Sequence, residues 1–206
     1  MKSWVGVAAL VLSVAGSAAD AAVAVIGTGH AAGCFKAAQD AGPLRGSGLL
    51  RDSKPLRDSK LLREGLRNCN RALGDDRLAA ADRAATYVNR GIVQMHAGNI
   101  DAALADYDAA IRTSPDTAEA YVNKGLALQR SGRDAEAVAL FSEGIARNPS
   151  RPELAYYSRA MAHETLGKTR EAYEDYSRAA QLAPDWPEPA EQLQRFKTIR
   201  AKTLTA

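Results

Sequence analysis

Apolar and small residues recur at a fixed interval through the second half of the 206-residue chain. The segment ATYVNRGIVQMHAGNIDAALADYDAAIRTSPD, which starts at Ala85, aligns without gaps with EAYVNKGLALQRSGRDAEAVALFSEGIARNPS, which starts 34 residues later at Glu119. A third copy, LAYYSRAMAHETLGKTREAYEDYSRAAQLAPD from Leu154, follows after one extra residue near Pro152. A period of this length is typical of repeat proteins in which each copy is one supersecondary unit.

Each copy is predicted to form two short helices that cross closely, because small side chains let helix axes approach. A proline has no N–H and its ring clashes with the preceding turn, so the proline near the end of each copy stops the second helix. The corresponding residues are Gly91, Gly125 and Ala160; Gly98, Gly132 and Gly167; Ala103, Ala137 and Ala172; Tyr107, Phe141 and Tyr176; Ala110, Gly144 and Ala179; and Pro115, Pro149 and Pro184.

These residues resemble the tetratricopeptide repeat, whose pattern has an aromatic residue at position 4, glycine at 8, alanine at 20, an aromatic residue at 24 and proline at 32. Numbered in this way, the repeats are 84–117, 118–151 and 153–186, and position 4 is Tyr87, Tyr121 and Tyr156. One departure is Ala160, which stands where the pattern has glycine. The resemblance implies an all-α solenoid of antiparallel helix hairpins.

The resemblance also implies a concave groove, lined by the first helix of each hairpin, that receives an extended peptide or a partner's helix. In the family, positions 2, 5, 6, 9, 12 and 13 supply the lining. Carried over to this sequence, the peptide-binding residues are Val88, Asn89, Ile92 and His96; Val122, Asn123, Leu126, Gln129 and Arg130; and Tyr157, Ser158, Met161 and Glu164.

Asn89 and Asn123 are the most informative of these residues. An asparagine amide offers a donor and an acceptor, so it can hold a peptide backbone whatever the side chains are. The alternative is that both amides bond to neighbouring helix groups. The lining lacks the lysine set with which some family members bind a terminal carboxylate, and we do not expect that specificity.

Both ends of the repeat array are predicted to be capped, because an open helix face would expose apolar surface. Residues 187–206 form the C-terminal cap and tail, with a helix from about Pro189 to Lys202 packed over Trp186. Residues 22–83 form an N-terminal arm and a degenerate hairpin, whose helices are GCFKAAQDAG and LLREGLRNCNRAL. If Gly42 is at position 15, Cys34 is at position 7 and lies beside Cys69 at position 24.

Residues 1–21 have the pattern of a secretory signal: Lys2, an apolar run from Trp4 to Ala15, and small residues ending in Ala19 and Ala21. An uncleaved membrane anchor is the alternative, although the run is shorter than the roughly 20 residues of a membrane span. Two cysteines in an exported chain usually pair, so we expect a Cys34–Cys69 disulfide. Lipidation of Cys34 is the competing interpretation, but Cys34 lies well beyond the apolar run.

Charge changes this picture only locally, since the net charge is +3. Residues 45–71 contain eight Lys or Arg and three Asp or Glu, an excess of five positive charges, so the rest of the chain is slightly acidic. The segment includes the tandem duplication LRDSKP and LRDSKL. A basic segment can contact an anionic membrane surface or an acidic partner. A solvated loop and helix face is the other interpretation.

No catalytic residue, cofactor site or metal site is expected. VAVIGTGHAAGCF from Val23 matches the dinucleotide-binding fingerprint, but no second strand with an acidic residue follows it. His30, His96 and His163 have no metal-ligand spacing. The sequence therefore predicts a periplasmic, non-enzymatic adaptor that binds a protein or peptide. A structural or self-associating protein is the alternative, and surface association through residues 45–71 is a third hypothesis.

Overall fold

The computed structural model of the protein describes residues 29–41 and 60–204, with side chains up to residue 196. Helices and the turns between them make up these residues, and no strand occurs among them. The predicted all-α architecture is therefore confirmed. The predicted signal over 1–21 and all but Lys60 of the duplicated LRDSK segment lie outside the described residues.

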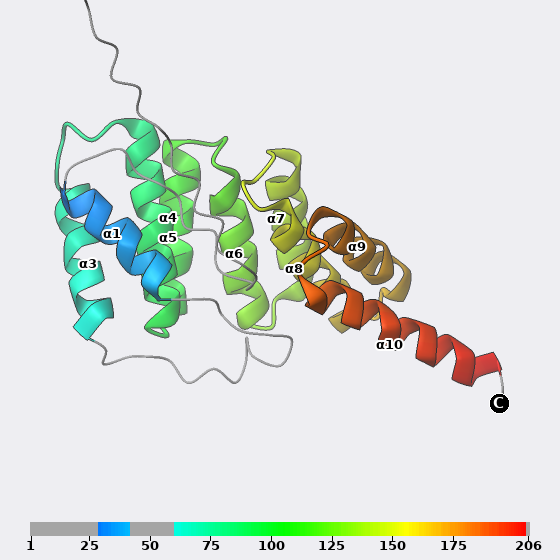
Figure 1. Cartoon of the computed structure of the whole chain (residues 1–206). Helices are drawn as coiled ribbons and strands as arrows, with labels where there is room; N and C mark the ends of the chain where they lie inside the picture. The colour runs from blue at the N-terminus through cyan, green and yellow to red at the C-terminus, as the bar shows by residue number, and fades with distance from the viewer. Residues whose placement is uncertain (1–28, 42–59, 205–206) are drawn as a thin grey trace, which may run out of the picture.

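The helices form successive antiparallel pairs, which follow one another from the blue and cyan N-terminal pair to the red C-terminal helix (Figure 1). The N-terminal hairpin consists of α1 (Gly29–Asp40) and α3 (Lys60–Leu73). The three repeats and the last helix are α4 (Ala80–His96) with α5 (Ile100–Thr113), α6 (Ala118–Arg130) with α7 (Asp134–Ala146), α8 (Pro152–Thr165) with α9 (Thr169–Leu182), and α10 (Pro187–Leu204).

Each repeat turns from its first to its second helix through a glycine with left-handed backbone geometry. The φ angles of Gly98, Gly132 and Gly167 are 81°, 74° and 73°. A side chain at this φ is disfavoured because its Cβ crowds the backbone, so glycine is the residue that the turn accepts at least cost. The tight turn keeps the two helices of a repeat antiparallel and adjacent.

The two helices of a repeat cross where position 8 meets the aromatic ring at position 24. A Cβ added to Gly91 would lie 2.5 Å from the ring of Tyr107, and one added to Gly125 would lie 2.7 Å from the ring of Phe141. A glycine inside a helix costs about 1 kcal/mol relative to alanine. Close approach of the aromatic ring accounts for glycine at these two positions.

The apolar core runs along the whole stack in three adjoining clusters. The first joins the N-terminal hairpin to the first repeat, the second joins the second repeat to α8, and the third joins α8 and α9 to Trp186 and α10. Trp186 is buried and belongs to the same cluster as Leu193 and Phe196, so α10 covers the last repeat. It begins at Pro187, two residues before the predicted start. None of the described helices has both the length and the apolar character that a membrane span requires.

A cation at position 7 links each repeat to the hairpin before it. Arg90 donates to Asn70 (2.8 Å), Lys124 to Asp108 (2.5 Å) and Arg159 to Ser142 (2.9 Å). Each acceptor occupies position 25 of the preceding hairpin. The second repeat has no acid opposite Lys124 within its own hairpin, and the structure shows that this lysine bonds across the repeat boundary instead.

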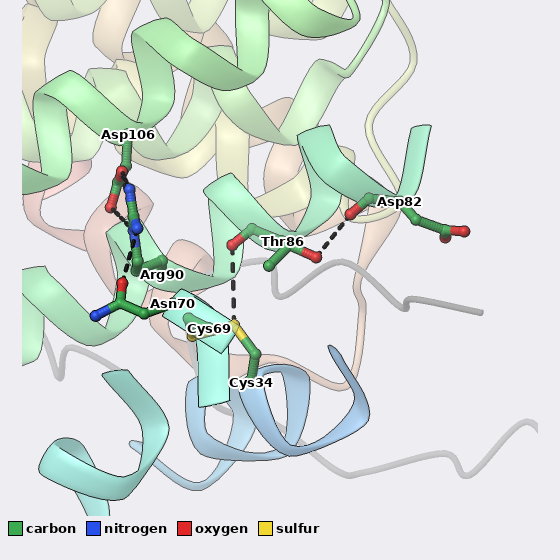
Figure 2. The surroundings of a disulfide bond; sticks show 7 residues. All are labelled: Cys34, Cys69, Asn70, Asp82, Thr86, Arg90 and Asp106. Carbon is green, nitrogen blue, oxygen red and sulfur yellow. Dashed lines mark hydrogen bonds and ion pairs between the residues drawn. A yellow bond between two sulfur atoms is a disulfide. The ribbon is translucent and has the colours of Figure 1, made fainter. Parts of the chain in front are cut away.

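In the N-terminal hairpin a disulfide between Cys34 and Cys69 takes the place of the aromatic contact (Figure 2). A Cβ added to Gly33 would lie 2.7 Å from the side chain of Asn68, so these two residues face each other across the hairpin. In the first repeat the residues that face each other in this way are Arg90 at position 7 and Asp106 at position 23. Cys34 thus corresponds to position 8 and not to position 7 as predicted. The two cysteines are 35 residues apart, whereas Arg90 and Asp106 are 16 apart, because the hairpin carries a long connection between its helices.

Candidate peptide-binding groove

The first helices α4, α6 and α8 lie side by side, and α10 extends the row beyond α8 (Figure 1). Residues three and four apart share one face of a helix, so positions 2, 5, 6, 9, 12 and 13 lie on one face of each first helix. Gln129 on α6 donates its amide to the Ser158 carbonyl of α8 at 3.3 Å, which fixes two of these faces together.

The structure buries nine of the thirteen residues predicted to line the groove. Half-buried side chains, which present some surface, are Leu126, Arg130, Met161 and Glu164. The buried ones are Val88, Asn89, Ile92, His96, Val122, Asn123, Gln129, Tyr157 and Ser158. The surface that a partner can reach is therefore the C-terminal half of the predicted lining, on α6 and α8.

The N-terminal half of the predicted lining belongs to the core. Val88 and Ile92 share one apolar cluster with Ala37 and Ala38 of α1 and with Leu62 of α3. The degenerate hairpin packs on the first repeat through these residues. Its sequence gave no indication of this contact, because α1 is rich in alanine and has no long apolar side chain except Phe35.

The Asn123 amide bonds to a neighbouring group of its own helix, which is the alternative to binding a peptide backbone. Its amide nitrogen donates to the Glu119 carbonyl one turn earlier in α6, at 2.9 Å, and its side chain is buried. Asn89 is equally buried on α4. Neither amide is therefore exposed to a partner in the groove.

Four residues of α10 extend the lining, and the sequence analysis missed them. If the 34-residue numbering is continued from Pro187, then Glu188, Glu191, Gln192 and Arg195 occupy positions 2, 5, 6 and 9. Arg195 accordingly meets Glu164 of α8, with an ion pair of 2.6 Å between Nη2 and Oε1. The continued numbering alone predicts this register, whereas the apolar spacing of α10 shows only its capping role.

Aromatic side chains and carboxylates meet at this C-terminal end of the groove. The ring of Tyr157 lies 4.7 Å from that of Trp186 and 5.3 Å from that of Tyr176. Tyr176 donates its hydroxyl to Glu164 at 3.0 Å. Burial, together with the negative charges of Glu188, Glu164 and Glu191, raises the pKa of Tyr157 to about 12.

The described residues contain no group of histidine, cysteine, aspartate and glutamate side chains that could hold a metal ion. His163 lies on α8, with its Nε2 atom 3.9 Å from the Asp175 carboxylate. Burial lowers the pKa of His163, and Arg159 lowers it further, against the opposing effect of Asp175. His163 is therefore a neutral, buried side chain that packs beside the Arg159–Asp175 ion pair.

Known proteins share the repeats and the architecture. Two family models described as tetratricopeptide repeat match residues 88–152 and 153–186. No curated protein matches the sequence. The solved structure of the first TPR of Spaghetti (RPAP3) bound to the HSP90 peptide SRMEEVD is 25% identical, with a TM-score of 0.56, over 59% of this chain and 98% of that one.

Two further structures are similar in fold. The first TPR domain of human RPAP3 is 24% identical, with a TM-score of 0.54, and covers 60% of this chain and 96% of its own. The crystal structure of MamA is 19% identical, with a TM-score of 0.58, and covers 70% of this chain and 83% of its own.

Proposed function

Because this chain belongs to the tetratricopeptide repeat family, we propose that it is a non-enzymatic adaptor that binds an extended segment of a partner protein in its groove. The observation that carries this proposal is the row of half-buried side chains on neighbouring first helices. Leu126, Met161 and Glu164 lie on adjacent helices, and α10 continues the row with Glu191 and Arg195. A surface that alternates apolar and polar groups suits a peptide, whose side chains need pockets and whose backbone needs hydrogen bonds.

The ligand differs in charge from the one seen in a similar structure. The peptide SRMEEVD, which is bound to the TPR of Spaghetti, contains three acidic residues. The end of the groove in this protein presents Glu188 and Glu191 and has no lysine among its lining residues. Like charges would repel, so we do not extend that peptide specificity to this chain.

We place the adaptor in the periplasm or outside the cell. The signal-like residues 1–21 support this location, as does the pairing of Cys34 with Cys69, since disulfides persist mainly in oxidising compartments. A cleaved N-terminus on the protein isolated from its native cells would test export directly. The same sequencing would identify the first residue of the mature chain.

A second candidate is association with an anionic surface through the basic segment, of which residues 60–71 are described. Lys60, Arg63, Arg67 and Arg71 recur at spacings of three and four along α3, and each is exposed. Residues at these spacings share a helix face. Binding to vesicles containing anionic lipid, lost as salt rises, would favour this function.

Site-specific crosslinking tests the adaptor function. A photoreactive amino acid at Met161 should capture a partner in intact cells, and the same group at Arg178, exposed on α9, should not. A synthetic peptide from the captured protein should then bind the purified chain. Met161→Asp should weaken that binding about tenfold, because the bound peptide would bury the new carboxylate against an apolar side chain.

The adaptor function is wrong if both probes capture the same proteins, or if the captured sequence binds Met161→Asp as tightly as the unchanged chain. Sedimentation of the purified protein separates the self-associating alternative. A single-chain mass at micromolar concentration agrees with an adaptor, whereas a concentration-dependent series of larger species favours self-assembly.

A further inference from the structure

We propose that the C-terminal end of the groove, between α8 and α10, recognises a lysine or arginine side chain of the bound segment. The proposal rests on the adaptor function and adds to it the charge of the ligand and its place in the groove. Three features of this end carry it: two carboxylates without a basic partner, a buried carboxylate oxygen that lacks a hydrogen bond, and an unpaired indole N–H.

The carboxylates come from the first turns of α10. Glu188 and Glu191 occupy positions 2 and 5 of the continued repeat numbering, next to Tyr157 at position 5 of α8. Of the basic side chains that the structure describes, none lies within ion-pair distance of either carboxylate; Arg195 pairs with Glu164. Three glutamates thus gather around Tyr157, and one nearby arginine balances only one of them.

Two buried polar atoms at this end lack a hydrogen-bond partner. They are Oε2 of Glu188 and Nε1 of Trp186. Trp186 is more than nine-tenths buried. A buried polar group without a partner is costly, so such atoms indicate an absent ligand group.

The chemistry of these atoms specifies the ligand. Carboxylate oxygens are acceptors, and a lysine ammonium or an arginine guanidinium supplies several donors at once. The indole N–H of Trp186 is a donor and fits a backbone carbonyl of the same segment.

Burial is the main cause of the raised pKa of Tyr157, and the negative charges of Glu188, Glu164 and Glu191 raise it further. These charges agree with the assignment, because they place the hydroxyl in a negative potential. A positive ligand group at this place would reduce that potential.

Nuclear magnetic resonance of the full chain tests the proposal with three capped pentapeptides, Ac-Ala-Ala-Xaa-Ala-Ala-NH2, in which Xaa is arginine, norleucine or glutamate. The arginine peptide should shift the Trp186 indole N–H resonance saturably and bind at least tenfold more tightly than the norleucine peptide. Glu188→Gln together with Glu191→Gln should weaken the arginine peptide about tenfold, as expected for loss of a charged hydrogen bond.

Glu174→Gln on the exposed face of α9 is the matched control and should leave binding unchanged. A thermal melt of each variant separates lost binding from lost folding, since Glu188 also lies at the N-terminus of α10. Equal binding of the arginine and norleucine peptides, or unchanged binding in the double variant, overturns the proposal. A peptide captured at Met161 that binds without charge preference would leave the adaptor function intact while removing this inference.

Discussion

The guanidinium group of Arg90 holds two hairpins together by bonding to Asp106 and Asn70 at once. It donates to both carboxylate oxygens of Asp106, on the second helix of its own repeat, and to the amide oxygen of Asn70 on α3 (Figure 2). Only 7% of the Asp106 side chain is exposed, and 23% of Arg90. The planar fork of arginine suits this arrangement, because its donors point in fixed directions toward two acceptors.

Arg90→Met should destabilise the protein by about 3 kcal/mol, because it leaves the buried carboxylate of Asp106 without a partner. Lys124→Met is the matched control in the second repeat. Its partner Asp108 is 42% exposed and stays hydrated, so the cost should be below about 1 kcal/mol. Urea unfolding of both variants measures the difference, and equal costs would show that burial of the acid is not what matters.

Gly125→Leu should destabilise the fold by about 3 kcal/mol through overpacking against Phe141. The ring lies within 2.7 Å of where a Cβ would stand, so the added side chain must displace it. Ala160→Gly, at the same position of the third repeat, is the reciprocal control. It should cost only about 1 kcal/mol, because it changes helix propensity and removes one methyl group. Thermal melts followed by circular dichroism would compare them; an unaffected Gly125→Leu melt would contradict the packing described here.

Replacing both Cys34 and Cys69 by serine should remove about 4 kcal/mol from the stability of the N-terminal hairpin, according to the chain-entropy estimate for a loop of this length. The sulfur atoms are fully buried, and Sγ of Cys34 lies 3.8 Å from the Thr86 carbonyl of α4. Hydrogen exchange should therefore accelerate in α1 and α3 and change little in α8 and α9. Uniform acceleration along the chain would mean that the hairpin is required by every repeat.

The stability of the third repeat should fall as the pH drops below about 6.5, because the pKa of His163 is lower in the folded than in the unfolded protein. Burial favours the neutral imidazole, so the unfolded chain binds the proton more readily than the folded protein. The unfolded state is therefore stabilised relative to the folded state as the pH falls. The contribution of His163 is complete above pH 6.5 and declines toward its folded pKa. His163→Gln should reduce the difference between the free energies of unfolding measured by urea at pH 7.5 and at pH 5.5. If that difference is unchanged, other groups cause it.

The repeat pattern was sufficient to predict the fold, because each of its positions has a packing role in this structure. Glycine at 91 and 125, the aromatic rings that cover them and the turn glycine at 98 each determine one contact within a hairpin. The sequence did not reveal which groove positions remain accessible. Val88 and Ile92 are buried by α1, a helix made largely of alanine, and its packing depends on a disulfide between distant residues.

The lining from α10 was missed for a different reason. Leu193 and Phe196 predict a covering helix and conceal the continued numbering, in which Glu188 and Arg195 face the groove. One helix therefore both closes the core and presents polar groups at the site. The amphipathic spacing of α10 predicts that it covers the core. Only the continued repeat numbering predicts that its polar residues face the groove.

The cation at position 7 also explains how an array of this kind can grow by duplication of its genetic unit. Asn70, Asp108 and Ser142 differ in chemistry but all accept a hydrogen bond, so a copied hairpin would find a compatible neighbour wherever it was inserted. The series stops at α10, where the corresponding residue is the apolar Leu193. Further copies can therefore be added between existing hairpins, whereas a copy placed after α10 would meet no reciprocal contact.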